Sequence, residues 1–211
     1  MTDQPLILAI ETSTLSCSVA LFRGDQLLGD TQAKEAQHVH GKQLLPMIDA
    51  LLRSNSLGSK DLESVAVSSG PGSYTGLRIG VSTAKGIAHA HGLALMAFDS
   101  LHVQAFAAAA SGDWDAVIAV MDARRDEVYT ASFVPQESQF EIADETRALI
   151  LESNMHAAAL FPVLARTKKL NRVCIIGDAA EKTHRLLADQ LNDCTFVSDF
   201  PQAKHMHQLS L

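Results

Sequence analysis

One glycine-rich segment, residues 68–80, limits the possible folds most, because it has to carry the chain from a buried strand into a helix. Its loop residues are Gly70, Pro71, Gly72, Ser73, Thr75, Gly76 and Arg78. Glycine allows positive φ and lets a second backbone or an anion come close. The helix that follows begins with unpaired N–H groups and a positive dipole end. The segment is therefore either a phosphate cradle or a tight turn that lets helices pack closely.

The first half of the chain predicts three strands, a helix, a strand, a helix and a further strand. Apolar and alternating runs place the strands at 6–11, 16–22, 26–33, 64–68 and 93–98, and the helices at 39–53 and 76–91. Pro46 lies inside the first helix and should kink it or mark a later start.

The second half repeats this order. Strands are predicted at 116–122, 127–134, 139–146 and 173–177, and helices at 152–165 and 180–191. The first strand of each half ends in an acid, Glu11 or Asp122. Two such βββαβα lobes with mixed sheets form the duplicated, RNase H-like α/β fold of the actin, sugar-kinase and Hsp70 superfamily. We therefore expect an N-terminal lobe at 1–107 and a C-terminal lobe at 108–211; one irregular α/β domain is the alternative.

The predicted helix at 76–91 has three stripes. The polar stripe consists of Arg78, Ser82, Lys85 and His89. The other two stripes are apolar or small, and because one apolar stripe is enough to cover a sheet, a second indicates burial on both sides. Glycine in a helix interior costs about 1 kcal/mol relative to alanine, so Gly80 and Gly86 indicate close packing. The neighbour is the kinked helix at 39–53, a second protein, or both.

No catalytic motif is complete. The loop lacks the phosphate-binding GxxxxGK[ST] pattern, because Leu77 and Arg78 stand where Lys and Ser or Thr are needed. Ser73 does not lie in a GxSxG elbow, so its expected role is that of a turn or capping hydroxyl. Three His-x-His pairs lack a nearby set of further ligands, and we expect no metal, no cofactor and no catalytic residue in this chain. Glu11 and Asp122 either serve Mg²⁺ chemistry across a cleft, as in a phosphotransferase, or cap strand ends.

Composition argues against several classes of protein. A net charge of −7 argues against a chain that binds nucleic acid tightly with its own surface. Cys17, Cys174 and Cys194 form no CxxC pair, which is typical of reduced thiols in a cytoplasmic protein. The N-terminus shows no secretory signal, and no apolar run reaches the length of a membrane span.

Four motifs together resemble one family. They are ILAIETS at 7–13, His40 ahead of LLPMI at 44–48, GPGSYTGLRIG at 70–80, and DAR at 122–124 with EVY at 127–129. From residue 6 to about residue 199 the chain resembles the bacterial TsaB (YeaZ) family. The glycine-loop string is the most distinctive part of the match.

This resemblance implies a non-catalytic scaffold subunit that activates the related protein TsaD. With TsaD and the ATPase TsaE, such a subunit serves the N6-threonylcarbamoylation of the adenosine next to the anticodon in tRNA. The complex uses ATP and a metal through its other members, and tRNA binds only via the complex. Alone, such proteins form a homodimer through a similar surface of N-terminal-lobe helices. The interface residues implied here are Leu44, Leu45, Ile48, Leu77, Gly80, Val81, Ala84 and Ile87.

Departures from the nucleotide-binding relatives predict that an ATP and metal site has decayed. The metal-ligand histidines of TsaD fall on Ser100 and Gln104, the strand-end aspartate is Glu11, and a Gly-Gly pair is reduced to Gly177 and Asp178. The residues of the vestigial nucleotide cleft would be Glu11, Ser13, Asp122 and Gly177.

The functional alternatives are a stand-alone ATP-dependent phosphotransferase or ATPase of the same fold, and a glycoprotease-like metallopeptidase. The chain stops at Leu211, inside what resembles the family's last helix at 202–211, so we expect the C-terminal lobe to be truncated there.

Overall fold

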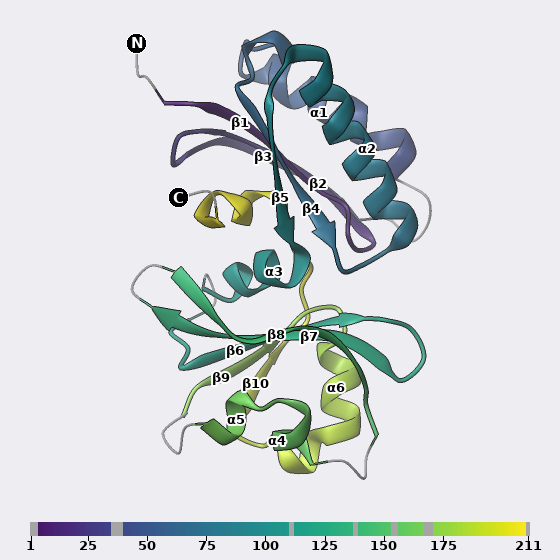
Figure 1. Ribbon diagram of the computed structural model, residues 1–211, viewed down its shortest axis with the longest axis vertical. Helices are drawn as coiled ribbons and strands as arrows, with labels where there is room; N and C mark the ends of the chain where they lie inside the picture. The colour runs from purple at the N-terminus through teal and green to yellow at the C-terminus, as the bar shows by residue number, and fades with distance from the viewer. Residues whose placement is uncertain are drawn as a thin grey trace. The chain divides into compact units, whose positions relative to one another are not determined.

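Most contacts of the chain fall within two units (Figure 1). The computed structural model describes residues 4–34, 40–109, 112–136, 139–152, 156–166 and 171–209. Unit 1 comprises Met1–Val103 and Pro201–Leu211, and unit 2 comprises Gln104–Phe200. Within the described residues, no helix combines the length and apolar character that crossing a membrane requires.

Unit 1 is built on a five-stranded mixed sheet in the order β3-β2-β1-β4-β5. Strand β2 pairs antiparallel with both β1 and β3, whereas β4 pairs parallel with both β1 and β5. The elements are β1 (Leu6–Glu11), β2 (Ser16–Arg23), β3 (Gln26–Lys34), α1 (His40–Ser54), η1 (Ser59–Asp61), β4 (Ser64–Gly70), α2 (Tyr74–His91) and β5 (Ala94–Asp99). Helix α3 (Ser100–Ala109) follows β5 and spans the boundary between the units. The strands and helices predicted for this half are confirmed. Helix α3 was not predicted.

Strand β1 is buried on both of its faces, which explains its continuous apolar run. Leu6, Leu8 and Ile10 face a core that α1 and α2 close from one side (Figure 1). Ile7 and Ala9 face the opposite side of the sheet, where a C-terminal 3₁₀ helix, η3 (Ala203–Leu209), covers them.

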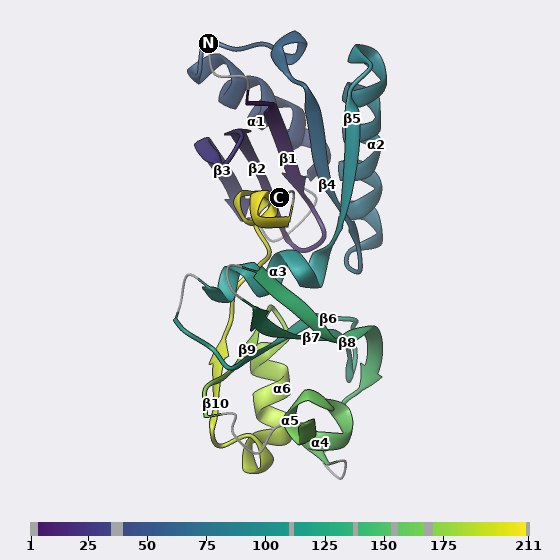
Figure 2. The same cartoon turned by 60° about the vertical axis from the view of Figure 1, so that its left-hand side comes forward.

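The C-terminal segment therefore belongs to unit 1, as both views show (Figures 1 and 2). Ala203 and Met206 pack against the sheet, and the Ala203 amide donates to the Ser18 hydroxyl at 2.9 Å. The predicted lobe at 108–211 differs from this arrangement in its last eleven residues, and the helix expected at 202–211 is a 3₁₀ helix over its described part. The expected boundary at residue 107 lies inside α3.

Unit 2 repeats the architecture with the strand order β10-β9-β6-β7-β8. Strand β7 pairs antiparallel with β6 and with β8, and β9 runs parallel to β6 and β10. The elements are β6 (Ala116–Asp122), β7 (Glu127–Gln136), β8 (Gln139–Ile150), α4 (Ala157–Leu160), α5 (Val163–Arg166), β9 (Val173–Ile176), α6 (Ala180–Leu187), η2 (Ala188–Gln190) and β10 (Cys194–Val197). The same central pairing in both units confirms the duplicated fold.

In unit 2 the helices are shorter than predicted, and one short strand was not predicted. The helix expected at 152–165 is two short helices, because Pro162 separates α4 from α5 and has no amide hydrogen to donate. The helix expected at 180–191 ends as an α-helix at Leu187. Strand β10 was not predicted, and it has only four residues. In unit 1, α1 begins at His40 and continues past Pro46, so the alternative of a later start is wrong.

Candidate partner-binding site

The glycine loop rests directly on the turn between β1 and β2. A Cβ atom on Gly72 would overlap the Ser13 carbonyl oxygen, and one on Gly76 would overlap the Thr12 carbonyl oxygen. On the next turn of α2, a Cβ on Gly80 would overlap the Thr12 hydroxyl. The turn at 12–13 thus occupies the space that a side chain at any of these three positions would need, which explains why glycine stands there.

Hydrogen bonds fix this contact. The Thr12 hydroxyl donates to the Gly76 carbonyl oxygen at 2.9 Å, and the Ser73 amide donates to the Ser13 carbonyl oxygen at 2.6 Å. Ser73 is the N-cap of α2 and accepts the Gly76 amide at 3.3 Å, which confirms its capping role. Two amides of the loop thus bond within the chain. This favours the interpretation as a tight packing turn over that as a phosphate cradle.

Glu11 is enclosed beneath this turn. Its side chain is fully buried, and its carboxylate accepts the Ser13 amide at 2.6 Å and the Ser68 hydroxyl. Burial raises the pKa of Glu11, and these hydrogen bonds oppose the rise only in part. Ser13 is also buried, and its own hydroxyl has no hydrogen-bond partner. Glu11 and Ser13 therefore support the turn from inside unit 1.

The other two residues of the predicted nucleotide cleft lie in unit 2. Asp122 ends β6 and accepts a bond from the Lys182 ammonium, while its amide donates to Asp178 at 2.8 Å. Burial raises the pKa of Asp178. Gly177 has a φ of +142°, and a Cβ there would overlap the Val120 carbonyl oxygen. Both residues thus have structural roles within unit 2, and a cleft shared with Glu11 stays a prediction.

Lys182 is the residue of this cluster that sequence analysis missed. Its ammonium also donates to the carbonyl oxygens of Arg125 at 2.7 Å and Glu127 at 2.9 Å. Arg124 and Arg125 have φ values of +73° and +50°, a conformation that costs energy for residues other than glycine. Lys182 therefore holds a strained hairpin tip, and no local pattern in the sequence signals this role.

The side of α2 that is buried in unit 1 includes residues that were predicted to contact a partner. Gly76, Gly80, Ala84 and Ala88, spaced by four residues, are buried against unit 1. Leu77, Val81 and Ile87 are half-buried, and the last two pack on the same core. The exposed residues of α2 include the predicted polar stripe, which consists of Arg78, Ser82, Lys85 and His89.

Helix α1 shows the same division. Leu44 and Ile48 are 1% and 5% exposed and belong to the core, whereas Leu45 is 60% exposed. The predicted interface must therefore be corrected, because Leu44, Ile48, Gly80 and Ala84 face the sheet and cannot reach a partner in this conformation. Contact of a partner with Leu45, Leu77, Val81 and Ile87 stays a prediction.

An exposed surface remains where α1 and α2 meet. The Ile79 side chain lies 3.7 Å from the Cβ position of Gly41, and a hollow of about 450 Å³ lies between the two helices. Tyr74 is 75% exposed, and the Arg78 guanidinium lies 5.3 Å above its ring centre. We call this surface the α1–α2 face. It consists of the residues that line the hollow, which are Gly41, Thr75, Arg78, Ile79, Ser82 and Thr83, together with the exposed residues Leu45, Tyr74 and Lys85 of the same two helices.

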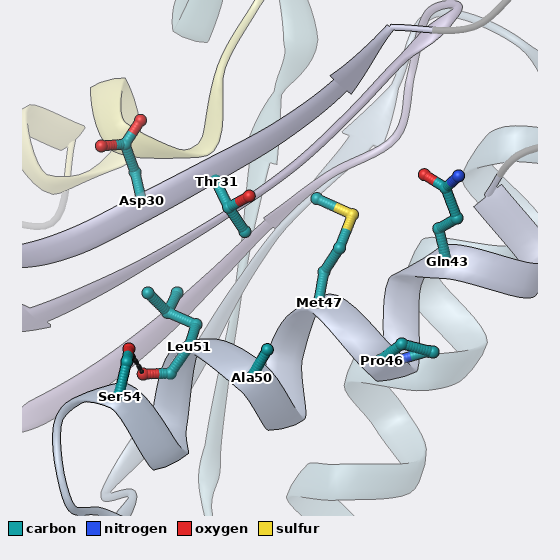
Figure 3. Close-up of a pocket in the computed structure, with 8 residues that line it drawn as sticks. All are labelled: Asp30, Thr31, Gln43, Pro46, Met47, Ala50, Leu51 and Ser54. Carbon is teal, nitrogen blue, oxygen red and sulfur yellow. Dashed lines mark hydrogen bonds between the residues drawn. The ribbon is translucent and has the colours of Figure 1, made fainter.

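A second groove of about 470 Å³ lies between α1 and β3 (Figure 3). Met47 points from α1 toward Thr31 of β3, and Leu51 lies one turn further along the helix. The residues that line it are Asp30, Thr31, Gln43, Pro46, Met47, Ala50, Leu51 and Ser54. Asp30 is the only charged residue among those that line the groove, so the groove offers mainly apolar contact rather than a cluster of ionisable groups.

The described residues contain no group of three or more His, Cys, Asp or Glu side chains arranged to hold a metal ion. Ser100 and Gln104, which stand at the positions of the TsaD histidines, are buried on α3. A hydroxyl and a carboxamide are poorer metal ligands than imidazoles.

Known proteins resemble this chain in sequence and in fold. The sequence model of the family described as "TsaD: tRNA N6-adenosine threonylcarbamoyltransferase" matches residues 31–201. The tRNA threonylcarbamoyladenosine biosynthesis protein TsaB of Haemophilus influenzae is 37% identical over 140 residues, which are 65% of this chain and 58% of the relative. TsaB of Escherichia coli is 32% identical over 150 residues, 71% of this chain and 64% of the relative. The alignments thus span less than two thirds of both relatives.

The solved structure of YeaZ from Pseudomonas aeruginosa superposes with a TM-score of 0.79 at 25% identity. The superposition covers 98% of this chain and 90% of that one, so both units share its fold.

Proposed function

Because the chain belongs to the TsaB (YeaZ) family, we propose that it serves the biosynthesis of threonylcarbamoyladenosine in tRNA as a non-catalytic subunit. In this proposal it binds a TsaD-type protein through the α1–α2 face, and TsaE joins the complex. The chain acts in the cytoplasm. The partners supply ATP and metal chemistry, and tRNA is bound only by the assembled complex.

One observation carries the choice of surface. Leu45 and Tyr74 are 60% and 75% exposed, although each lies on a helix whose opposite face is already closed against the sheet. Exposed large apolar side chains beside polar ones are typical of protein interfaces. The hollow between the helices and the half-buried Ile79 give this surface a shape into which another helix can pack.

The enclosure of Glu11 supports a non-catalytic role. A stand-alone phosphotransferase of this fold would use a strand-end carboxylate near Mg²⁺ and water. Here both carboxylate oxygens of Glu11 accept hydrogen bonds from Ser13 and Ser68, and the side chain has no exposed surface. The geometry therefore suits a support for the glycine loop better than a ligand of a catalytic ion.

Reconstitution tests the proposal. Purified TsaD-type protein, TsaE, the threonylcarbamoyl donor and tRNA are combined in three reactions: with the wild-type chain, without the chain, and with the Leu45→Asp variant. We expect modification to depend on the chain and to fall by about tenfold or more with Leu45→Asp, since a buried unpaired charge opposes docking. The matched control is Ile142→Asp, which alters another exposed apolar side chain, on β8. Full modification without the chain, or an unaffected Leu45→Asp, would contradict the proposal.

A further inference from the structure

The hairpin between β6 and β7 carries two arginines in a backbone conformation that favours glycine. We call residues 123–127 the β6–β7 tip. Arg124 and Arg125 have φ values of +73° and +50°, and both side chains are exposed. Glycine or asparagine would adopt these angles at a lower cost. Because strained residues of this kind gather at ligand contacts, the two side chains indicate a role outside the fold.

Hydrogen bonds from two other segments hold the backbone of the β6–β7 tip. The Lys182 ammonium of α6 donates to the carbonyl oxygens of Arg125 at 2.7 Å and Glu127 at 2.9 Å. The amide of Leu151, the residue after β8, donates to the Asp126 carbonyl oxygen at 2.7 Å. A backbone that is already fixed loses little conformational freedom when its side chains bind a ligand.

The guanidinium groups of the tip are available to a ligand. Arg78, Arg147 and Arg172 each contact another side chain or a carbonyl oxygen of the chain. Neither Arg124 nor Arg125 forms an ion pair or a side-chain hydrogen bond with another residue in the described part of the chain. A guanidinium binds phosphate or carboxylate oxygens through two parallel N–H groups. The tip therefore offers two forks for oxyanions.

The surroundings of the two arginines favour phosphates of a nucleic acid over carboxylates of a protein. Ala123 is the only apolar residue of the tip, and it is half-buried. Protein interfaces depend on buried apolar or aromatic anchors, whereas contacts to a nucleic-acid backbone need none. Asp126 and Glu127 are exposed and balance the charge of the two arginines. The tip is therefore too weak to hold a nucleic acid by itself, which agrees with the net charge of −7.

We propose that Arg124 and Arg125 contact phosphate groups of the tRNA backbone when the chain is part of the assembled complex. The inference rests on the proposed function and gives the chain a second role, since it would hold substrate as well as a protein partner. Phosphate contacts position a nucleic acid without reading its sequence, so this contact adds affinity and not base specificity.

The experiment measures tRNA binding by the complex of the full chain with the TsaD-type protein of the same organism. Fluorescence anisotropy gives the dissociation constant from about 50 to about 300 mM KCl. The test variant combines Arg124→Asn with Arg125→Asn, because asparagine tolerates positive φ and should leave the chain at least as stable in urea. We expect tRNA binding to weaken by about three- to thirtyfold at low salt, and the slope of log Kd against log salt to fall by about one to two.

Two further variants separate the guanidinium contact from fold and net charge. Arg124→Lys with Arg125→Lys keeps both cations without the fork, so it should keep most of the salt dependence and lose about two- to threefold in affinity. Arg23→Gln with Lys60→Gln removes two cations from unit 1 and should leave tRNA binding unchanged.

The outcomes separate this inference from the proposed function. Unchanged tRNA affinity and salt dependence in the asparagine variant would overturn the inference and leave the proposed function intact. An equal loss in the Arg23 and Lys60 variant would show an effect of net charge alone and also overturn it. Loss of the TsaD-type protein from the asparagine variant would assign the tip to a protein partner, against the inference. A wild-type chain that does not join the complex would overturn the proposed function, and the inference with it.

Discussion

The Thr12 hydroxyl donates a hydrogen bond of 2.9 Å to the Gly76 carbonyl oxygen, across 64 positions of sequence. This bond joins the first turn of unit 1 to the first turn of α2, and the Cβ positions of Gly76 and Gly80 point at the same threonine. The glycine segment therefore positions α2 on the sheet, and through α2 it positions the exposed α1–α2 face.

Gly76→Ala should destabilise unit 1. Its Cβ would overlap the Thr12 backbone oxygen, which cannot move without displacing the β1–β2 turn. Overpacking of this kind costs about 1–3 kcal/mol. The free energy of unfolding, measured in urea, checks this.

The matched control is Gly86→Ala in the same helix. Apart from its chain neighbours and the nearby backbone of its own helix, no atom lies within 4 Å of a Cβ at Gly86, so alanine should instead stabilise the helix by about 0.5–1 kcal/mol. Equal effects of the two substitutions would refute the packing explanation.

Leu44→Ala and Leu45→Ala should differ in kind although the leucines are neighbours. Leu44 is 1% exposed, so its truncation should cost about 2–5 kcal/mol of stability. Leu45 is 60% exposed, so its truncation should change stability by less than about 0.5 kcal/mol while weakening partner binding. Urea unfolding and calorimetric titration with the TsaD-type protein measure the two effects. A large stability loss in Leu45→Ala would show that this face is part of the core.

Glu11→Gln should remove part of the pH dependence of stability. Burial raises the pKa of Glu11 in the folded chain above its ordinary value of 4.5, so the folded state binds more protons than the unfolded state in the pH window between the two pKa values. Glu11 thus makes the wild-type chain less stable as pH rises through that window. Glutamine keeps an acceptor for the Ser13 amide without this charge.

Unfolding of the wild type and Glu11→Gln, compared from about pH 4 to pH 8, tests this expectation. The variant should gain stability relative to the wild type as pH rises. A constant difference across that range would mean that Glu11 does not titrate in it. Glu11→Ala, which removes the acceptor and leaves a cavity, should be less stable than either at every pH.

Lys182→Met should loosen the hairpin between β6 and β7. The substitution removes the bonds to Asp122, Arg125 and Glu127, and hydrogen bonds from a charged donor contribute about 1.5–3 kcal/mol each at most. Hydrogen exchange should accelerate at the amides of 123–127 and stay slow in β9. Arg185→Met on the same helix is the control, and equal exchange in both variants would contradict the role assigned to Lys182.

Sequence patterns predicted most elements of unit 1 because its strands and helices are long and strongly periodic. The cap at Ser73 and the duplicated order of strands were also predictable, since turn chemistry and repeats are local signals. The packing partner of the glycines was not predictable in this way. Small residues show that something approaches closely, but they do not say whether it is a helix, a protein or the turn at 12–13.

The burial of several predicted interface residues could not be predicted for a related reason. In α1 the apolar residues Leu44, Leu45, Met47 and Ile48 cover a wide arc of the helix, so composition alone does not say which of two neighbouring leucines faces the sheet. The C-terminal residues Ala203 and Met206 return to unit 1 through contacts with β1 and β2 that are nearly two hundred positions away in sequence, which no local pattern encodes.

Hydrogen exchange of the chain, alone and mixed with the TsaD-type protein, tests the proposed docking surface most directly. We expect protection that is concentrated in α1 and α2, at 40–54 and 74–91, with none in α6 at 180–187. Protection confined to unit 2, or a complex that leaves the amides of α1 and α2 unchanged, would contradict this expectation.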